Sequence, residues 1–203
     1  RGGRKSNGFR YAGSNTLFVA LNDGRILYWK ELVPGRSEPL QLAKVADSNW
    51  GEISFEPHGR VLAAGTGNTR GTVFLWDLQT GQQLNSLRGH NAKITGISFS
   101  SDGNLMATSS YDGSVCVWHM DDLNTLPITY DEHATWVMSL TFSPDDQYVI
   151  SGDKDGNIRT LPVDIATITN DYCSYLTRDL TETEWQNYVG TDIPYEPAKC
   201  EDL

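Results

Sequence analysis

The chain has 203 residues and a formal net charge of −10, and 38% of its residues are hydrophobic, 10% aromatic and 21% charged. This composition is typical of a globular protein that buries a core, which excludes a disordered or fibrous chain. The longest apolar run, Leu17–Leu21, is far shorter than the roughly 18 residues that a membrane-spanning helix requires. A transmembrane helix is therefore excluded, and we expect no membrane partner.

The charge is unevenly distributed along the chain. Residues 1–100 carry 12 Lys and Arg against 7 Asp and Glu, whereas residues 101–203 carry 4 against 19. A strongly negative segment repels phosphate backbones, so we expect no nucleic-acid partner. The excess of negative charge in residues 101–203 favours protein partners with a basic surface.

Three cysteines lie far apart, at Cys116, Cys173 and Cys200. They follow no metal-binding spacing, and their odd number argues against a disulfide framework. The sequence leaves open whether Cys173 and Cys200 pair. This cysteine usage suits a reducing compartment, so we expect a cytoplasmic location.

Four stretches of the chain repeat one pattern of an apolar run, a turn and a second alternating run. Their last residues lie 47, 42 and 43 residues apart, a third apolar run precedes each, and a polar linker with a short fourth run follows. This period predicts four four-stranded meanders. The stretches are NTLFVALNDGRILYW (15–29), RVLAAGTGNTRGTVFLW (60–76), NLMATSSYDGSVCVW (104–118) and QYVISGDKDGNIRTL (147–161).

Asp-Gly pairs stand at the middle hairpin of three repeats, at 23–24, 112–113 and 155–156. In a type I′ turn both central residues need positive φ, which Asp-Gly tolerates. We therefore predict type I′ hairpins at all three positions. The second repeat has the longer turn GNTRG (67–71) instead.

A single meander cannot bury both its faces, and radial stacking of such units gives a β-propeller. The repeats resemble those of the WD-repeat (WD40) family. The resemblance rests on Gly89-His90, Asp112-Gly113 and Trp118 in one repeat and on Trp76-Asp77 in another. The resemblance implies an all-β fold of four blades that belong to a seven-bladed propeller. Four blades alone expose an open edge unless missing blades, a partner fragment or another copy covers it. The expected blades are about 2–46, 47–88, 89–131 and 132–164.

The resemblance also implies a hydrogen-bond network that holds each blade together. In the third repeat it would join His90, Thr108, Asp112 and Trp118, with Ser110 as the alternative hydroxyl. In the fourth repeat it would join His133, Ser151 and Asp155, but Leu161 replaces the indole, so we expect this blade to be less rigid.

The same residue types occur in hydrolase triads, but these hydroxyls lie within strands and recur at the repeat period, which favours a structural role. The stretch GDKDGNI (152–158) has Pro162 where a calcium-binding loop needs Glu, and GTGNTRG (65–71) has Arg70 where a dinucleotide fingerprint needs Gly. His58 and His119 stand alone. We therefore predict no catalytic residue, no metal site and no cofactor.

Residues 165–203 lose the alternation of the repeats. An apolar stripe from Ile165 to Leu176 indicates one helix, and a capping box at Thr181 and Glu184 begins a second that ends at Gly190. We expect a short helical extension that packs on the propeller; a solvated acidic tail is the alternative.

The tail is similar to the C-terminal signature of large bacterial WD-repeat proteins. This likeness implies that the chain ends a longer protein with an effector or signalling domain. The matching residues are Leu180, Thr181, Glu184, Trp185, Gly190, Pro194, Tyr195 and Cys200.

In the family's geometry, the middle hairpins and the starts of the first strands emerge on one face. Aromatic and basic residues there are candidate anchors for a protein or peptide partner. Trp136 could instead pack under the C-terminal tail. The candidate binding residues are Trp136, Tyr111, Lys93, Arg70, Lys154 and Asn22.

These observations favour a non-catalytic protein-interaction or sensor module that acts for an attached effector domain. Missing blades or that effector domain of the same protein are further expected partners. Two alternatives stay open, namely a propeller enzyme or small-ligand binder that uses the central channel, and a purely structural assembly module.

Overall fold

The computed structural model describes residues 6–12, 16–21, 23–30, 38–45, 50–68 and 70–163, together with Thr181 and Thr183. The chain divides into two compact units, Arg1–Leu161 and Pro162–Leu203, and the sheets lie in the first except for the last residue of β15. The expected helical extension over 165–203 falls almost entirely outside the described residues. In the described part, no helix is long and apolar enough to cross a membrane.

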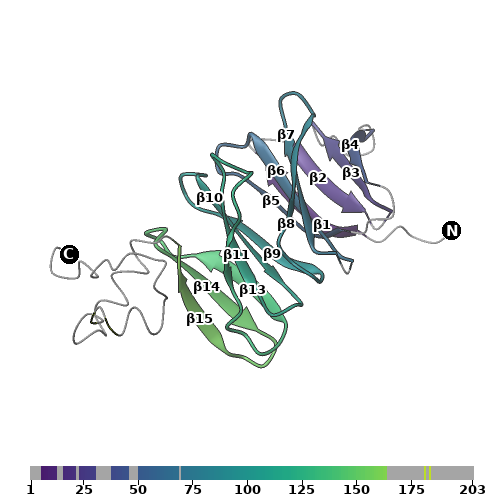
Figure 1. Ribbon diagram of the computed structural model, residues 1–203. Coiled ribbons are helices and arrows are strands. Elements are labelled where there is room, and N and C mark those ends of the chain that lie inside the picture. The colour runs from purple at the N-terminus through teal and green to yellow at the C-terminus, as the bar shows by residue number, and fades with distance from the viewer. Residues whose placement is uncertain are drawn as a thin grey trace. The chain divides into compact units, whose positions relative to one another are not determined.

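The described residues form four antiparallel sheets that follow one another along the chain (Figure 1). The first sheet has the order β1 (Ser6–Ala12), β2 (Thr16–Leu21), β3 (Arg25–Trp29) and β4 (Leu40–Lys44). The second has β5 (Trp50–Phe55), β6 (Val61–Thr66), β7 (Thr72–Asp77) and β8 (Gln83–Arg88).

The third sheet has β9 (Ile94–Phe99), β10 (Leu105–Ser110), β11 (Val115–His119) and β12 (Ile128–Tyr130). The fourth has β13 (Val137–Phe142), β14 (Tyr148–Asp153) and β15 (Ile158–Pro162). Sequential strands pair in every sheet, so the prediction of repeated all-β meanders is confirmed for the described residues.

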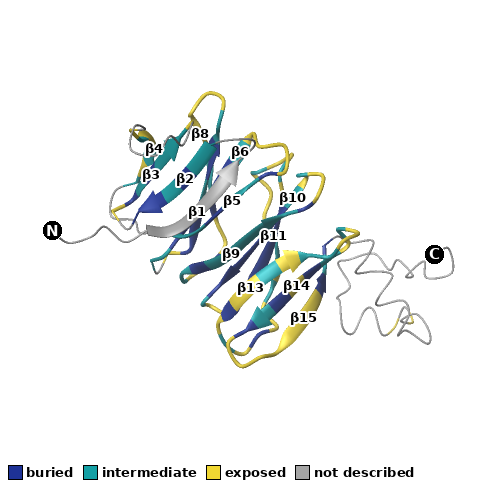
Figure 2. Ribbon diagram, turned by 180° about the vertical axis from the view of Figure 1, so that it is seen from behind, coloured by how far each residue is buried: buried dark blue, intermediate teal, exposed yellow. Residues whose placement is uncertain are grey.

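The core lies between successive sheets rather than within any one of them. Strand β5 contacts β1 on one side and β9 on the other, and β9 also contacts β13. One apolar cluster joins side chains of the first and second sheets, and another joins the second and third. Each strand alternates its side chains between two faces, so one sheet contributes to the cluster on either side of it. Figure 2 shows buried positions, in dark blue, along strands such as β2, β11 and β14.

The Asp-Gly hairpins differ from the predicted type I′ geometry. Gly113 donates its N–H to the carbonyl oxygen of Ser110, and Gly156 donates to that of Asp153 in the same way. Both glycines have positive φ, but the only non-glycine residue with positive φ in the described part of the chain is Asp146. Each hairpin loop is therefore one residue longer than the two-residue loop of a type I′ hairpin. The aspartate is the third residue of a four-residue turn, and the glycine is the fourth.

Close approach of the second and third sheets explains the small residue Gly65 on β6. A Cβ atom added there would overlap the side chain of Ile94 on β9. Gly152 on β14 occupies the corresponding register position, since it pairs with Ser139 as Gly65 pairs with Glu52. A Cβ atom at Gly152 would meet only Ser139 Oγ, at 3.6 Å.

We expect Gly65→Ala to lower the free energy of unfolding by about 1–3 kcal/mol, because the added methyl group overpacks the interface between the sheets. Gly152→Ala is the matched control and should change stability by less than about 1 kcal/mol. Urea denaturation of the two variants measures the difference. Equal stabilities would contradict the close contact between β6 and β9.

Candidate functional site

A connected polar network joins the loop before β9 to β10 and β11 of the third sheet. His90 Nε2 lies 2.8 Å from Thr108 Oγ1, and the indole N–H of Trp118 donates to that same oxygen at 2.9 Å. On the other side of the ring, His90 Nδ1 lies 3.3 Å from Asp112 Oδ2. The structure therefore brings together the four residues that the resemblance implies, with Thr108 rather than Ser110 as the hydroxyl.

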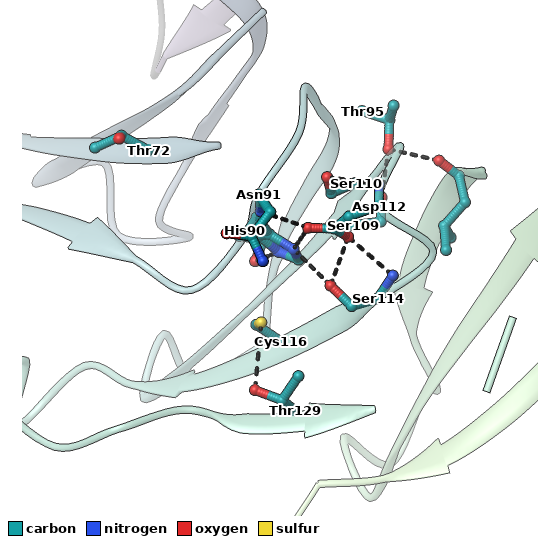
Figure 3. A network of polar contacts seen from close by, with 12 residues as sticks. Thr72, His90, Asn91, Thr95, Ser109, Ser110, Asp112, Ser114, Cys116 and Thr129 are labelled. Carbon is teal, nitrogen blue, oxygen red and sulfur yellow. Dashed lines mark hydrogen bonds and ion pairs between the residues drawn. The ribbon is translucent and has the colours of Figure 1, made fainter. Parts of the chain in front are cut away.

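Ser114 completes this network and is absent from the sequence-based prediction. Its hydroxyl lies 2.8 Å from His90 Nδ1 and donates to Asp112 Oδ1 at 2.6 Å (Figure 3). The backbone N–H of Ser114 donates to the same Asp112 oxygen, and Asn91 N–H donates to Asp112 Oδ2. In turns, an Asp side chain often accepts a hydrogen bond from the backbone N–H two residues later. The order Asp112-Gly113-Ser114 in the sequence could therefore have indicated the bond between Asp112 and Ser114.

The charges of His90 and Asp112 depend on each other. Burial of the ring opposes its protonation, but hydrogen bonds with Asp112 and Cys116 outweigh burial and raise the pKa of His90 to about 9. Burial also opposes ionisation of Asp112, yet hydrogen bonds from His90 and Ser114 hold the pKa of Asp112 well below its usual range. At neutral pH the two therefore form a hydrogen-bonded ion pair that ties the loop to the hairpin.

The corresponding network in the fourth sheet uses a different aspartate from the one predicted. His133 Nε2 lies 2.8 Å from Ser151 Oγ, as expected, but His133 Nδ1 lies 3.1 Å from Asp153 Oδ2. Asp155 is exposed and contacts Lys154 Nζ instead, so its assignment to this network is wrong. Residues two apart on a strand share a face, which places the Asp153 carboxylate beside Ser151 and under the imidazole.

The surroundings of Asp153 strengthen this arrangement. Asn157 donates to its carboxylate through both the backbone N–H and the side-chain amide. Hydrogen bonds from Asn157 lower the pKa of Asp153 below its usual range, against the opposing effect of burial.

Neither network offers a nucleophile to a substrate. Thr108 and Ser151 are buried within strands, and His90 and His133 are buried as well. A catalytic triad requires an exposed hydroxyl beside an oxyanion hole, so the arrangement is structural. Of the two histidines expected to stand alone, His58 contacts the carboxylate of Glu56 through Nδ1.

The predicted binding residues meet in part at the hairpins of the third and fourth sheets. The rings of Tyr111 and Trp136 stack with centroids 4.6 Å apart and an interplanar angle of 16°, and Lys93 Nζ lies 5.4 Å from the Tyr111 ring centre. Trp136 is 48% exposed. Two backbone bonds hold the pair in place, from Tyr111 N–H to the Lys93 oxygen and from Lys154 N–H to the Trp136 oxygen.

The remaining candidates are less closely joined. Arg70 is exposed and lines a pocket with Arg88 and Asn91 at the second sheet. Asn22 lies outside the described residues, and so does the segment under which Trp136 could have packed.

Comparison with known families identifies repeats within this chain. Residues 81–119 and 124–160 match the family described as WD40: WD domain, G-beta repeat. These segments run from β8 to β11 and from β12 into β15. These two segments therefore match WD40 repeats, and the sheets of the chain are consistent with blades of that type.

Several curated proteins are similar to part of the chain. It is 34% identical to the Periodic tryptophan protein 2 homolog of Schizosaccharomyces pombe, over 52% of this chain and 12% of that protein. It is 34% identical to the Target of rapamycin complex subunit wat1 of the same organism, over 68% of this chain and 42% of that protein. The chain thus spans less than half the length of either relative.

Solved structures share the fold. The computationally designed Ika4 protein is 26% identical with a TM-score of 0.65, over 79% of this chain and 92% of that one. A chain of the Mitotic Checkpoint Complex has a TM-score of 0.66 at 20% identity, over 77% of this chain and 47% of that one.

We expect Thr108→Val to lower the free energy of unfolding by about 2–4 kcal/mol, because it leaves the Trp118 indole and His90 without their shared partner. Thr141→Val, at an exposed position on β13 where the hydroxyl donates to the adjacent carbonyl oxygen of Phe142, should change stability by less than about 0.5 kcal/mol. Chemical denaturation measures both. A loss no larger than that of the control would contradict the network's role.

Asp153→Asn should destabilise the protein more than Asp155→Asn, because only Asp153 pairs with His133. The pKa of Asp153 is lower in the folded protein than the value of about 4 that an Asp has in the unfolded chain. Its carboxylate therefore stabilises the fold above pH 4, and this stabilisation is lost progressively as the pH falls below 4. The stability difference between wild type and Asp153→Asn should therefore shrink in acid. Thermal unfolding from pH 7 to pH 3 tests this, and a larger effect of Asp155→Asn would place Asp155 in the network instead.

Proposed function

We propose that this chain is a non-catalytic protein-interaction module that binds a protein or peptide partner at the hairpins of its third and fourth sheets. WD40 domains generally bind protein partners, and the repeats support the same role here. The observation that carries the proposal is the stack of Tyr111 on the exposed ring of Trp136. We call Tyr111, Trp136 and Lys93 the aromatic platform.

The aromatic platform has the physical properties of a binding anchor. Two stacked rings offer a large apolar surface that is already ordered, so a partner loses little conformational entropy when it binds there. The backbone bonds from Tyr111 to Lys93 and from Lys154 to Trp136 join each hairpin to the segment just before the first strand of its sheet, which orders the backbone that carries both rings before binding. Buried aromatic residues dominate the binding energy of many interfaces, and Trp and Tyr are the commonest of these anchors.

Charge near the platform indicates the chemistry of the partner. Lys93 lies over the Tyr111 ring, and Arg70 and Arg88 line the pocket at the neighbouring sheet. Exposed charges act over roughly 8–10 Å at physiological salt, so Lys93, which lies over the Tyr111 ring, influences a bound segment more than the net charge of the chain does. We therefore expect an apolar or aromatic side chain flanked by carboxylates, rather than the basic partner that the charge sum favours.

The similar proteins support a role within larger assemblies. One of them is named as a subunit of the Target of rapamycin complex, and this chain matches 42% of its length. We propose further that the repeats act for an effector or signalling domain, as the similarity of residues 180–200 to bacterial WD-repeat proteins implies.

A displayed library of random peptides, selected against the wild-type chain, tests the binding face. We expect selected peptides to combine an aromatic or aliphatic residue with neighbouring Asp or Glu. Trp136→Ala should weaken their binding by about tenfold or more, the loss typical of a truncated anchor, as measured by isothermal titration calorimetry.

Leu126→Ala is the matched control, since Leu126 is a large, exposed apolar residue in the loop at the opposite end of β11. It should bind the selected peptides as wild type does. Peptides that bind Trp136→Ala unchanged would show that the aromatic platform is not the binding face.

A further inference from the structure

A groove runs between the second and third sheets at one end of their strands. The second sheet contributes the turn between β5 and β6, the end of β7 and part of β8, and the third contributes the turn between β9 and β10 and the residues after β11. These turns lie at the opposite ends of β6 and β10 from the middle hairpins, so the groove is remote from the aromatic platform. Its volume of about 500 Å³ is within the range of pockets that bind ligands.

Apolar side chains from both sheets line this groove. Val61 on β6 and Met120 after β11 pack against the cluster between the two sheets and stay partly exposed. Leu84 on β8 is 49% exposed. A single exposed leucine is common on protein surfaces, but three apolar side chains in one groove offer area that the apolar part of a partner can cover.

Carboxylates from both sheets line the same groove. Asp77 ends β7, Asp102 lies in the turn between β9 and β10, and Asp121 follows β11. Hydrogen bonds from Ser100 and Asn104 lower the pKa of Asp102, so this side chain is ionised at neutral pH. The groove therefore combines apolar area with negative charge.

The cations that line the groove interact with carboxylates of their own sheet. His58 Nδ1 contacts the carboxylate of Glu56, which belongs to the same turn. A hydrogen bond from the Thr80 N–H and, to a smaller extent, the charge of Arg60 lower the pKa of Asp77. Both cations are thus associated with the second sheet.

The carboxylates of the third sheet have no such partner. In the described part of the chain, no Lys, Arg or His side chain forms an ion pair with Asp102 or Asp121. Among its described lining residues, the groove has four carboxylates and, as cations, only His58 and Arg60. A positive charge from outside the chain is therefore attracted to the third-sheet side of the groove.

This pattern suits a basic side chain better than a metal ion. Within the described ranges, no group of three or more His, Cys, Asp or Glu side chains is placed to hold one metal ion. Lys and Arg side chains, in contrast, join a long aliphatic stem to a charged head, so one residue can use both the apolar and the acidic lining. Arg has the further advantage of a planar guanidinium that donates several hydrogen bonds to carboxylates.

We propose that this groove binds an Arg or Lys side chain of a protein partner. The charged head pairs with Asp102 and Asp121, and the stem covers Leu84 and Met120. This surface is separate from the aromatic platform, and binding there does not require Trp136. The two ends of the sheets thus select partner segments of opposite charge.

A displayed peptide library, selected against the Trp136→Ala variant, tests the groove without a contribution from the aromatic platform. We expect the selected peptides to contain Arg or Lys. In the same background, Asp121→Lys should raise their dissociation constant about fivefold or more, because attraction to an exposed carboxylate becomes repulsion.

Asp131→Lys is the matched control, since it makes the same change in charge at another exposed position. Asp131 follows Tyr130, which pairs with Val115 at the opposite end of β11 from Asp121. This variant should change the dissociation constant by less than about twofold, because salt screens exposed charges beyond roughly 8 Å.

A second pair of variants tests the apolar lining. Leu84→Ala should raise the dissociation constant about threefold or more, because it removes area that the stem covers. Leu40→Ala is its control and should leave binding unchanged: Leu40 is 50% exposed on the last strand of the first sheet, as Leu84 is 49% exposed on the last strand of the second. Circular dichroism checks that each variant is folded.

A selection that returns no binding peptide, or only peptides without Arg and Lys, would overturn the proposal. Equal effects of Asp121→Lys and Asp131→Lys would overturn it too, because binding would then reflect the net charge of the chain and not the groove. Failure of the platform experiment leaves these measurements unaffected, since the protein used here lacks Trp136.

Discussion

A sheet in this fold, such as the second, places apolar side chains on both of its faces and cannot bury both of them by itself. The side chains of Leu62 and Ala63 are neighbours on β6, yet they enter different clusters, one toward the first sheet and one toward the third. Burial of either face therefore requires another sheet, and the stack is stable only as a series. Small residues such as Gly65 follow from this constraint, because they let the next sheet approach closely.

The polar networks are placed by the same packing. In the third sheet, an ionised Asp112 beside His90 is tolerated close to the core because each member has several hydrogen-bond partners. The network links a loop, a hairpin and a strand, so it fixes how the hairpin is presented. That hairpin carries Tyr111, whose ring stacks on Trp136 from the next sheet. The binding surface that we propose thus depends on contacts buried within the sheet and on the position of its neighbour.

Much of the fold could be predicted from the sequence, because local patterns determine local pairing. Alternating apolar runs and turn residues at a fixed spacing predict the meanders, and the strands pair as expected. The predicted type I′ hairpins were wrong in backbone conformation, and the predicted networks differed where side-chain direction mattered. Asp155 occupies the same turn position as Asp112, but the side chain that contacts His133 is that of Asp153 on the strand. Ser114 was missed because its role depends on where the imidazole of His90 lies, which a residue pattern does not contain.

Residue patterns along the chain suffice to establish that it repeats an all-β unit, that the unit resembles a WD repeat, and which residue types can link its parts. These properties depend on residues close together in the chain or at one repeated spacing. The folded structure, by contrast, determines which aspartate meets His133 and stacks Tyr111 on Trp136. The first outcome depends on the direction of side chains along a strand and the second on the position of the neighbouring sheet, and the spacing of residues along the chain contains neither.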